Sequence, residues 1–241
     1  MTDVMGVGTD QPQGVHATET CEARSASPPT PYYADQHVTL YHGDCRDLLP
    51  LPAIRGDAVL SDPPYGVEMD YGGTYRDTEA EWWALLDEVI PLMRKAAPFV
   101  VIPSCQILRI GEIYRRWSPD WLMCWHKGSP GTASKIGFND WEPLLCWGRP
   151  QRPMHDHFYA QPVPFDNGHP CPKPTEFFAK LIGMSTTAGA TVIDPFAGSG
   201  SMLRAAKNMG RKAIGIEREE RFCEIIVRRM DQGVLDFGGV A

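Results

Sequence analysis

Two short segments carry the residues that could do chemistry, and they lie far apart in the chain. The first is Asp62-Pro63-Pro64-Tyr65, in which two prolines fix the backbone between a carboxylate and an aromatic ring. Such a rigid tetrapeptide can hold a planar amino group. The second is Asp194-Pro195-Phe196-Ala197-Gly198-Ser199-Gly200, a glycine-rich turn that lets a backbone approach a small molecule closely. Together they predict one segment that orients a reacting group and another that binds a cofactor.

The glycine-rich turn lies between a predicted strand at 191–193 and a predicted helix at 201–209. Gly198 and Gly200 remove β-carbons where a ligand must touch backbone, and the helix N-terminus offers N–H groups to a carboxylate. For a bare pair of glycines, a tight turn with no ligand is the alternative. A dinucleotide site is a further alternative, although the turn does not match the pattern GxGxxG.

An acidic residue near the turn favours a nucleotide-like ligand. Glu217 follows the next predicted strand, at 213–216, which is where nucleotide-binding folds hold a ribose diol. The hydroxyl of Ser199 or Ser201 could cap the helix that follows the turn. We therefore expect the turn and Glu217 to bind one ligand.

The tetrapeptide is suited to activating an amine that is conjugated to an aromatic ring. Such an amine is a poor nucleophile because its lone pair is delocalised. Asp62 can accept one amine hydrogen and the Pro63 carbonyl another, which leaves the lone pair facing an electrophile. Tyr65 offers a flat face to the ring. The tetrapeptide follows an apolar strand predicted at 58–61, where ligands bind in α/β sheets, and this weighs against a simple turn that begins with Asp.

The order of these segments resembles the amino-methyltransferases of DNA, in the permuted arrangement in which the catalytic tetrapeptide precedes the cofactor loop. The resemblance covers roughly residues 36–232 and includes Trp125-His126-Lys127 and Trp141-Glu142-Pro143-Leu144-Leu145, which look like two late strands of the family. It implies a Rossmann-like α/β fold with a mostly parallel sheet flanked by helices, and S-adenosyl-L-methionine as the cofactor. The catalytic residues that it implies are Asp62, Pro63, Pro64 and Tyr65.

The same resemblance implies a cofactor site. In it Phe196 packs on the cofactor, Gly198 and Gly200 line the methionine end, and Glu217 binds the ribose hydroxyls. Asp44 and Cys45 match the position that meets the adenine ring, although Asp44 could equally cap a short helix. The segment His169-Pro170-Cys171-Pro172-Lys173-Pro174 resembles the HPxxKP segment that closes over the methionine moiety. The full implied set is Asp44, Cys45, Asp62, His169, Lys173, Asp194, Phe196, Ala197, Gly198, Ser199, Gly200, Glu217 and Arg218.

The first residue of the tetrapeptide bears on the methylated base. By the resemblance, Asp at position 62 favours the exocyclic N6 of adenine, whereas Ser would have favoured N4 of cytosine. The sequence therefore predicts a site-specific DNA (adenine-N6) methyltransferase, with Tyr65 stacking on a base rotated out of the duplex. A DNA cytosine-N4 methyltransferase is the alternative. A catalytically inactive DNA-binding module and an RNA methyltransferase are remoter alternatives.

Double-stranded DNA is the expected partner, and few residues are left to recognise it. Bases outnumber acids between 104 and 174, so a local basic face can form on a chain whose net charge is −7. Small target-recognition loops are expected at about 128–140 and 148–168, with a further loop at 66–78 beside the active site. The expected DNA contacts are Lys127, Lys135, Arg149 and Arg152, with His155, His157, Phe158 and Tyr159 as residues that could contact or stack on bases.

The 241 residues suit one sizeable domain. Residues 1–35 are rich in Thr, Ser, Pro and Gly and are expected to form a flexible tail, and 36–241 a single methyltransferase domain. Strands are predicted at 38–41, 58–61, 99–102, 121–125, 143–147, 191–193 and 213–216. Helices are predicted at 46–49, 79–97, 107–117, 175–183, 201–209 and 221–230, with a kink or break at Pro91.

Seven cysteines are scattered and never spaced as CxxC, which is a reduced pattern with neither a zinc site nor a disulfide framework. No apolar run reaches the roughly 18–20 residues of a membrane span, and no signal peptide is evident. We therefore expect a monomer or homodimer without metal in the cytoplasm of a prokaryotic or phage-infected cell, associated with the nucleoid through DNA. A restriction partner, chromosomal regulation and phage self-protection all fit a small, solitary enzyme of this kind.

Overall fold

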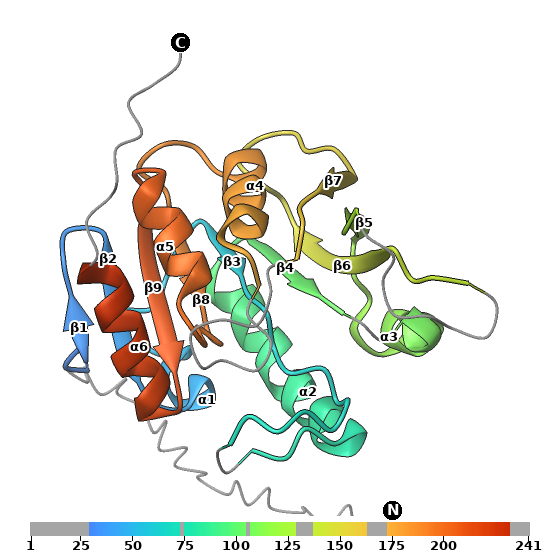
Figure 1. Cartoon of the computed structure of the whole chain (residues 1–241), viewed down its shortest axis with the longest axis horizontal. Coiled ribbons are helices and arrows are strands. Elements are labelled where there is room, and N and C mark those ends of the chain that lie inside the picture. The colour runs from blue at the N-terminus through green and yellow to red at the C-terminus, as the bar shows by residue number, and fades with distance from the viewer. Residues whose placement is uncertain (1–28, 73–74, 105–106, 129–136, 163–172, 232–241) are drawn as a thin grey trace, which may run out of the picture.

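The protein is built around one mixed β-sheet, seen in a computed structural model that describes residues 29–72, 75–104, 107–128, 137–162 and 173–231 (Figure 1). The strands of the described residues are β1 (Tyr33–Ala34), β2 (Val38–His42), β3 (Ala58–Leu60), β4 (Phe99–Pro103), β5 (Trp121–His126), β6 (Trp141–Gly148), β7 (His157–Tyr159), β8 (Thr191–Asp194) and β9 (Lys212–Glu217). Their order across the sheet is β1-β2-β9-β8-β3-β4-β6-β5-β7. Strands β2, β9, β8, β3 and β4 are mutually parallel, whereas β1 and β6 run antiparallel to their neighbours.

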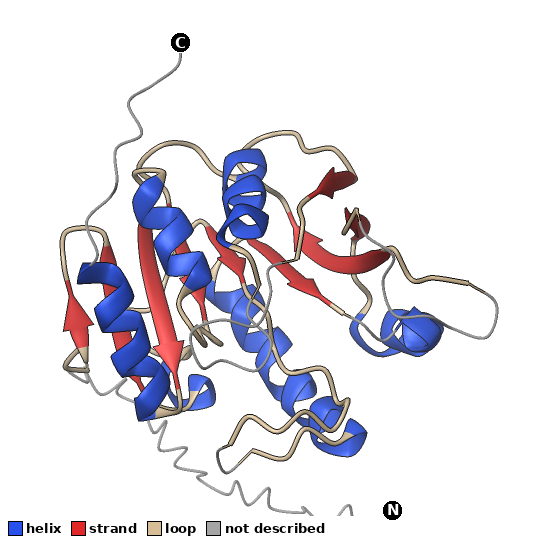
Figure 2. Cartoon of the chain, viewed as in Figure 1, coloured by secondary structure: helices blue, strands red, loops and turns tan. Residues whose placement is uncertain are grey.

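Helices cover both faces of the sheet (Figure 2). They are α1 (Cys45–Leu48), α2 (Glu79–Ala96), α3 (Ile110–Trp117) with a preceding 3-10 turn (Ile107–Arg109), α4 (Thr175–Ser185), α5 (Ser201–Asn208) and α6 (Glu220–Asp231). Strand β4 shows how the layers form, because its side chains alternate between the faces. Phe99 and Val101 join the apolar layer under α4, α5 and α6, while Val100 and Ile102 join the layer under α1, α2 and α3. The predicted α/β fold with a mostly parallel sheet is confirmed.

Three local features differ from the predictions. Strand β1 lies inside the predicted tail and pairs with β2, so the fold begins before residue 36. Strand β7 lies in the stretch at 148–168 that was predicted to be a loop. Helix α2 runs past Pro91 without a break. Val89 and Met93, on either side of that proline, are both fully buried, and this tertiary packing outweighs the lost backbone hydrogen bond.

The direction of the strands decides which residues can meet. In parallel strands the carboxyl ends share one side of the sheet, which we call the carboxyl edge. Asp44 just beyond β2, Asp62 just beyond β3, Asp194 at the end of β8 and Glu217 at the end of β9 all lie there. Ligands of open α/β sheets bind at this edge. Among the helices of the described residues, none is long and apolar enough to cross a membrane.

Candidate active site

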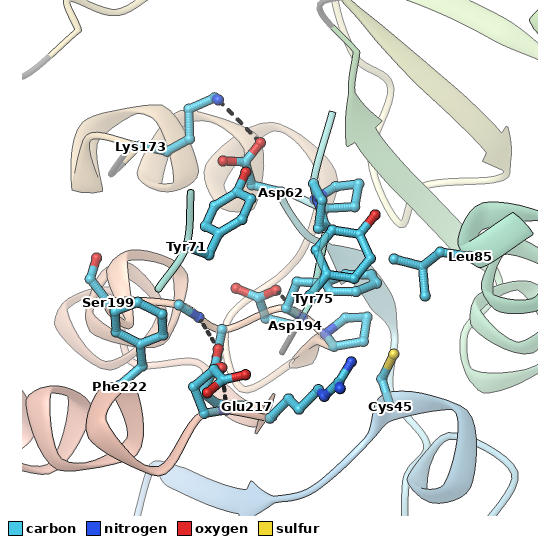
Figure 3. Close-up of a pocket in the computed structure, with 18 of the residues that line it drawn as sticks. Cys45, Asp62, Tyr71, Tyr75, Leu85, Lys173, Asp194, Ser199, Glu217 and Phe222 are labelled. Carbon is cyan, nitrogen blue, oxygen red and sulfur yellow. Dashed lines mark hydrogen bonds and ion pairs between the residues drawn. The ribbon is translucent and has the colours of Figure 1, made fainter. Parts of the chain in front are cut away.

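A cavity opens at the carboxyl edge, and both of the predicted chemical segments line it (Figure 3). The predicted site residues that line it are Asp44, Cys45, Asp62, Pro63, Pro64, Tyr65, Lys173, Asp194, Phe196, Ala197, Gly198, Ser199, Glu217 and Arg218. Gly200 is not among the residues that line the cavity. His169 falls outside the described residues. The fold therefore joins two segments that are far apart in sequence into one site.

The carboxylate of Asp62 is held by two neighbours. The Tyr65 hydroxyl donates a hydrogen bond of 2.6 Å to Asp62 Oδ1, and Lys173 Nζ lies 3.1 Å from the same oxygen. Lys173 also donates to the Tyr65 hydroxyl at 2.6 Å, with its Nζ 4.6 Å from the centre of the tyrosine ring. The ammonium therefore offsets the charge of the Asp62 carboxylate and lies over one face of the ring predicted to stack on a base. The sequence patterns assigned Lys173 only to the cofactor and did not indicate this contact.

The charge of Asp62 depends on this arrangement. Burial raises the pKa of Asp62, while the Lys173 ammonium and the Tyr65 hydroxyl oppose that rise, and Glu142 adds to it. An ionised carboxylate only accepts hydrogen bonds and does so strongly at both oxygens, whereas a protonated carboxyl group donates from one of them. Lys173 is therefore positioned to keep Asp62 in the form that can accept an amine hydrogen.

The glycine-rich turn is anchored to the strand before it. Asp194 is buried and accepts hydrogen bonds from the Ser61 hydroxyl and, at 3.1 Å, from the Phe196 amide. Burial raises the pKa of Asp194 to about 7, and the nearby Asp62 and Glu217 carboxylates contribute to that rise. Asp194 thus shapes the turn through its hydrogen bonds while sharing in the negative charge of the carboxyl edge.

The two glycines of the turn have different roles. Gly198 has a φ of +51° and lines the cavity, as predicted. Gly200 has a φ of +79° and is the N-cap of α5, where an added β-carbon would lie 3.0 Å from the side chain of Ile226. Gly200 therefore permits close packing of the turn against α6, which is a structural reason for a glycine that the sequence assigned to the cofactor.

Neither serine of the turn caps α5, contrary to the prediction, because the N-cap makes no side-chain hydrogen bond. Instead Arg229 reaches back from α6. Its guanidinium donates to the hydroxyls of Ser199, Ser201 and Thr175, at 3.4, 3.2 and 2.8 Å. Arg229 thereby ties α4 and α6 to the turn.

Glu217 is 8% exposed and is oriented by backbone amides. One carboxylate oxygen accepts a hydrogen bond from the Gly198 amide at 2.7 Å, and the other accepts from the Glu219 amide at 2.8 Å. Burial raises the pKa of Glu217, and these amide donors oppose the rise. Each carboxylate oxygen can accept more than one hydrogen bond, so Glu217 retains acceptor capacity toward the cavity.

At the far side of the cavity, Asp44 and Cys45 lie beyond the end of β2. Asp44 caps α1 through a 2.9 Å hydrogen bond from the Arg46 amide and also pairs with the Arg46 guanidinium. The capping alternative for Asp44 is therefore correct, although its side chain lines the cavity as well. Burial raises the pKa of Cys45 to about 12, so its thiol stays neutral and is no nucleophile.

The predicted DNA contacts fall in different places. Lys127 follows β5 at the carboxyl edge, where it pairs with the buried Glu142 at 2.5 Å. Arg149 and Arg152 follow β6, which runs antiparallel to β4, and the Arg149 amide bonds to the Pro98 carbonyl at the opposite edge. Their position argues against contact with a base in the cavity. Lys135 falls outside the described residues.

The predicted base contacts from β7 and the residues before it also separate. Phe158 is 7% exposed and packs in the core, so it cannot stack on a base. Tyr159 is exposed and ends β7 at the carboxyl edge, 6.0 Å from the ring of His126. His155 and His157 are exposed farther back along that segment. Tyr159 therefore keeps the better position for a nucleic-acid contact.

Aromatic and apolar side chains complete the cavity, and most were not singled out from the sequence. They are Val67, Met69, Tyr71 and Tyr75 from the segment after the tetrapeptide, Leu85 from α2, Phe178 from α4 and Phe222 from α6. The closely spaced tyrosines at 65, 71 and 75 were the available signal. Within the described part of the chain, no cluster of His, Cys, Asp and Glu has an arrangement that could hold a metal ion.

Comparison with known proteins agrees with this geometry. A family model described as DNA methylase matches residues 109–228. The type II methyltransferase M2.LlaDCHI of Lactococcus lactis subsp. cremoris is 24% identical over 249 residues, covering 84% of this chain and 93% of that protein. The DNA adenine methyltransferase YhdJ of Escherichia coli K12 is 23% identical over 248 residues, covering 83% and 84%.

Solved structures share the fold. The PvuII DNA methyltransferase, described as cytosine-N4-specific, has a TM-score of 0.63 and 16% identity, with 85% of this chain and 90% of that chain covered. Solved neighbours also include complexes with S-adenosylmethionine. The relatives thus include proteins named for each of the two bases.

Proposed function

We propose that this chain, a DNA methyltransferase of the N6/N4 family, methylates the exocyclic N6 of adenine in double-stranded DNA. The observation that supports this most is the position of Asp62. It begins the tetrapeptide at the end of β3, lines the cavity, and is held by Tyr65 and Lys173. A planar amine that enters the cavity would meet a fixed carboxylate there.

The cavity fits S-adenosylmethionine, the cofactor of this family, which supplies an electrophilic methyl group. At one end, Glu217 is fixed by two backbone amides and can accept hydrogen bonds from ribose hydroxyls. Asp44 and Cys45 lie where an adenine ring would follow, and Gly198 lets the ligand approach the turn. Phe196, Ala197, Ser199 and Arg218 complete the proposed cofactor set, with Asp194 shaping the turn and Lys173 bordering it.

The tetrapeptide would then supply orientation and electrostatic stabilisation. We expect Asp62 to accept one amine hydrogen and the Pro63 carbonyl to accept the other, so that the nitrogen lone pair points away from them. Lys173 already donates to Asp62, so an arriving amine would share that oxygen or take the other one. The methylated nitrogen is strongly acidic and needs no strong base to lose its proton. Rigid placement is therefore the main contribution of the protein.

The preference for adenine follows from Asp at position 62 and is supported by the relative named for adenine. Methylation of cytosine N4 is the second candidate, because the PvuII structure superposes over most of this chain and is described as specific for that atom. Both reactions use an exocyclic amine beside a ring nitrogen. A carboxylate that accepts a hydrogen bond suits either amine, so the base must be identified directly.

Product identification tests the proposal. Duplex DNA of mixed sequence would be incubated with the protein and methyl-labelled cofactor, digested to nucleosides and separated by chromatography. We expect N6-methyl-2′-deoxyadenosine carrying the label, and far less of it when Asp62→Ala replaces the native protein. Label in N4-methylcytosine would establish the second candidate instead. Label in RNA but not in duplex DNA would overturn both.

DNA recognition is proposed to occur at the carboxyl edge. Lys127 and Tyr159 lie there, and the loop at 128–140 begins there, so a base bound near Asp62 would bring the flanking duplex over them. Arg149 and Arg152 lie at the opposite edge and are set aside. This region is small, which favours a short target sequence or two copies sharing one duplex.

A further inference from the structure

The segment that follows the tetrapeptide is held in place by one buried carboxylate. Asp77 is 3% exposed, and its side chain accepts hydrogen bonds from the amides of Gly66, Val67 and Met69 at 2.7, 3.1 and 3.2 Å. Its own carbonyl accepts a 2.7 Å hydrogen bond from the Glu68 amide. This ring of backbone donors joins the start of the segment to its end. Residues 66–69 and Asp77 are therefore held together beside the cavity.

Tyr75 lies two residues before Asp77 and lines the cavity, as Figure 3 shows. Its hydroxyl oxygen is buried and has no hydrogen-bond partner among the described residues. A buried hydroxyl normally finds a partner, because losing its water without replacement destabilises the protein. Because Tyr75 lines a cavity, a bound ligand is the partner that we consider for this hydroxyl.

The surroundings of Tyr75 indicate which part of the cavity it serves. The charge of Arg218 lowers the pKa of both Tyr75 and Asp44, and all three side chains line the same cavity. Asp44 and Arg218 belong to the ends of β2 and β9, on the cofactor side of the cavity. Nearby, an added β-carbon at Gly72 would lie 2.7 Å from the guanidinium of Arg221, so this segment reaches across to the start of α6. These relations associate Tyr75 with the cofactor side of the cavity.

We propose that the Tyr75 hydroxyl hydrogen-bonds to the adenosyl moiety of S-adenosylmethionine, with Asp77 holding the segment that carries it. Burial and the carboxylates of Asp77 and Glu81 raise the pKa of Tyr75, so the hydroxyl remains protonated and can donate. The inference rests on the cofactor assigned under the proposed function but does not depend on which base is methylated.

The test measures binding in the absence of DNA. Calorimetry would compare Tyr75→Phe with the native protein for two probes, S-adenosylhomocysteine and 5′-methylthioadenosine, which share the adenosyl group but differ in the amino-acid portion. Loss of one neutral hydrogen bond should lower the affinity for both ligands by the same factor, about three- to tenfold. Tyr114→Phe, an exposed tyrosine on α3 far from the cavity, is the matched control and should bind both ligands normally.

Thermal unfolding without ligand separates a binding role from a structural one. Because the hydroxyl has no partner in the described structure, Tyr75→Phe should unfold at the native temperature or above it. Unchanged affinity for both probes would overturn the proposal, as would a variant that is both destabilised and weakened in binding. Normal probe affinity with a raised KM for DNA would assign Tyr75 to the target base and overturn it too. If the product proves to be N4-methylcytosine, the proposed base is wrong while this result stands.

Discussion

Replacing Lys173 by methionine should move the acid limb of the methylation rate to higher pH. Asp62 must be ionised to accept an amine hydrogen, and Lys173 Nζ lies 3.1 Å from it on a side chain that is 6% exposed. At an effective dielectric constant of about 20, such a pair attracts by about 5 kcal/mol, which is an upper limit of roughly 4 pKa units. Carboxyl groups beside a cation usually show shifts of about 1–3 units. We therefore expect the pKa of Asp62, and the acid limb with it, to rise by about 1–3 units.

Single-turnover methylation measured from about pH 5.5 to about pH 9 gives the limb directly, since product release does not contribute to it. Cofactor affinity is measured in parallel, so that a binding defect is not read as a catalytic one. Lys173→Arg keeps a cation and should leave the limb close to its native position. An unmoved limb in Lys173→Met, with the protein folded and the cofactor bound, would refute the argument that Lys173 controls the charge of Asp62.

Three further predictions follow from the same geometry. Asp62→Ala should lower the rate of single-turnover methylation by about 10²–10³ with cofactor affinity nearly intact. Glu217→Ala should chiefly weaken cofactor affinity in calorimetry. Near-normal turnover by Asp62→Ala would show that the tetrapeptide has no part in the mechanism. The folded state binds the Asp194 proton more tightly than the unfolded state, because the pKa of Asp194 is raised to about 7, so native stability falls as pH rises from about 4 to about 7. Asp194→Asn should therefore be more stable than the native protein in urea unfolding above pH 7, by up to about 4 kcal/mol, with no such gain near pH 4; an equal difference at both pH values would contradict the raised pKa. Gly148→Ala should lower the free energy of unfolding by about 2 kcal/mol or more, because φ is +81° and the new β-carbon would lie 2.0 Å from the Pro98 carbonyl oxygen; native stability would show that the backbone adjusts there.

The positions of the main chemical groups were predictable because parallel strands give a simple rule. Asp62 and Asp194 each follow an apolar run, and such runs form neighbouring parallel strands, β3 and β8, whose carboxyl ends coincide. Glu217 follows by the same rule from β9. The spacing of these residues in sequence therefore carried enough information to place them in one site.

The position of Arg149 and Arg152 could not be predicted, because nothing local in the sequence determines the direction of a strand. The run that becomes β6 is as apolar as the parallel strands, yet it pairs antiparallel with β4, with Phe99 opposite Gly148. That reversal carries the residues after β6 to the other edge. Strand direction is decided by tertiary pairing and chain connection, which a propensity pattern does not contain.

The sequence motifs also could not predict contacts between side chains that are distant in the sequence. The pairing of Lys173 with Asp62 depends on how α4 and its preceding residues pack over the sheet, and the Arg229 contacts to Ser199 and Ser201 depend on the position of α6. A serine beside a helix start was a sound indication of a cap, but a guanidinium from another helix competes for the same hydroxyl. Such outcomes follow from packing and not from local preference.

The charged side chains that line the cavity are mostly acidic, and this affects which ligand the cavity prefers. Its described lining includes five carboxylates, Asp44, Asp62, Asp194, Glu217 and Glu219, and two cations, Lys173 and Arg218. Burial raises the pKa of Asp62, Asp194 and Glu217, and repulsion from the Asp62 and Glu217 carboxylates adds to the rise at Asp194, so negative charge on these groups lowers stability. A ligand with net positive charge offsets that cost, whereas its neutral product does not. S-adenosylmethionine carries a sulfonium and S-adenosylhomocysteine lacks it, so we expect an acidic carboxyl edge to favour the methyl donor over the spent cofactor. We therefore expect the carboxylates that hold the turn, Asp194 and Glu217, also to help to exchange product for substrate.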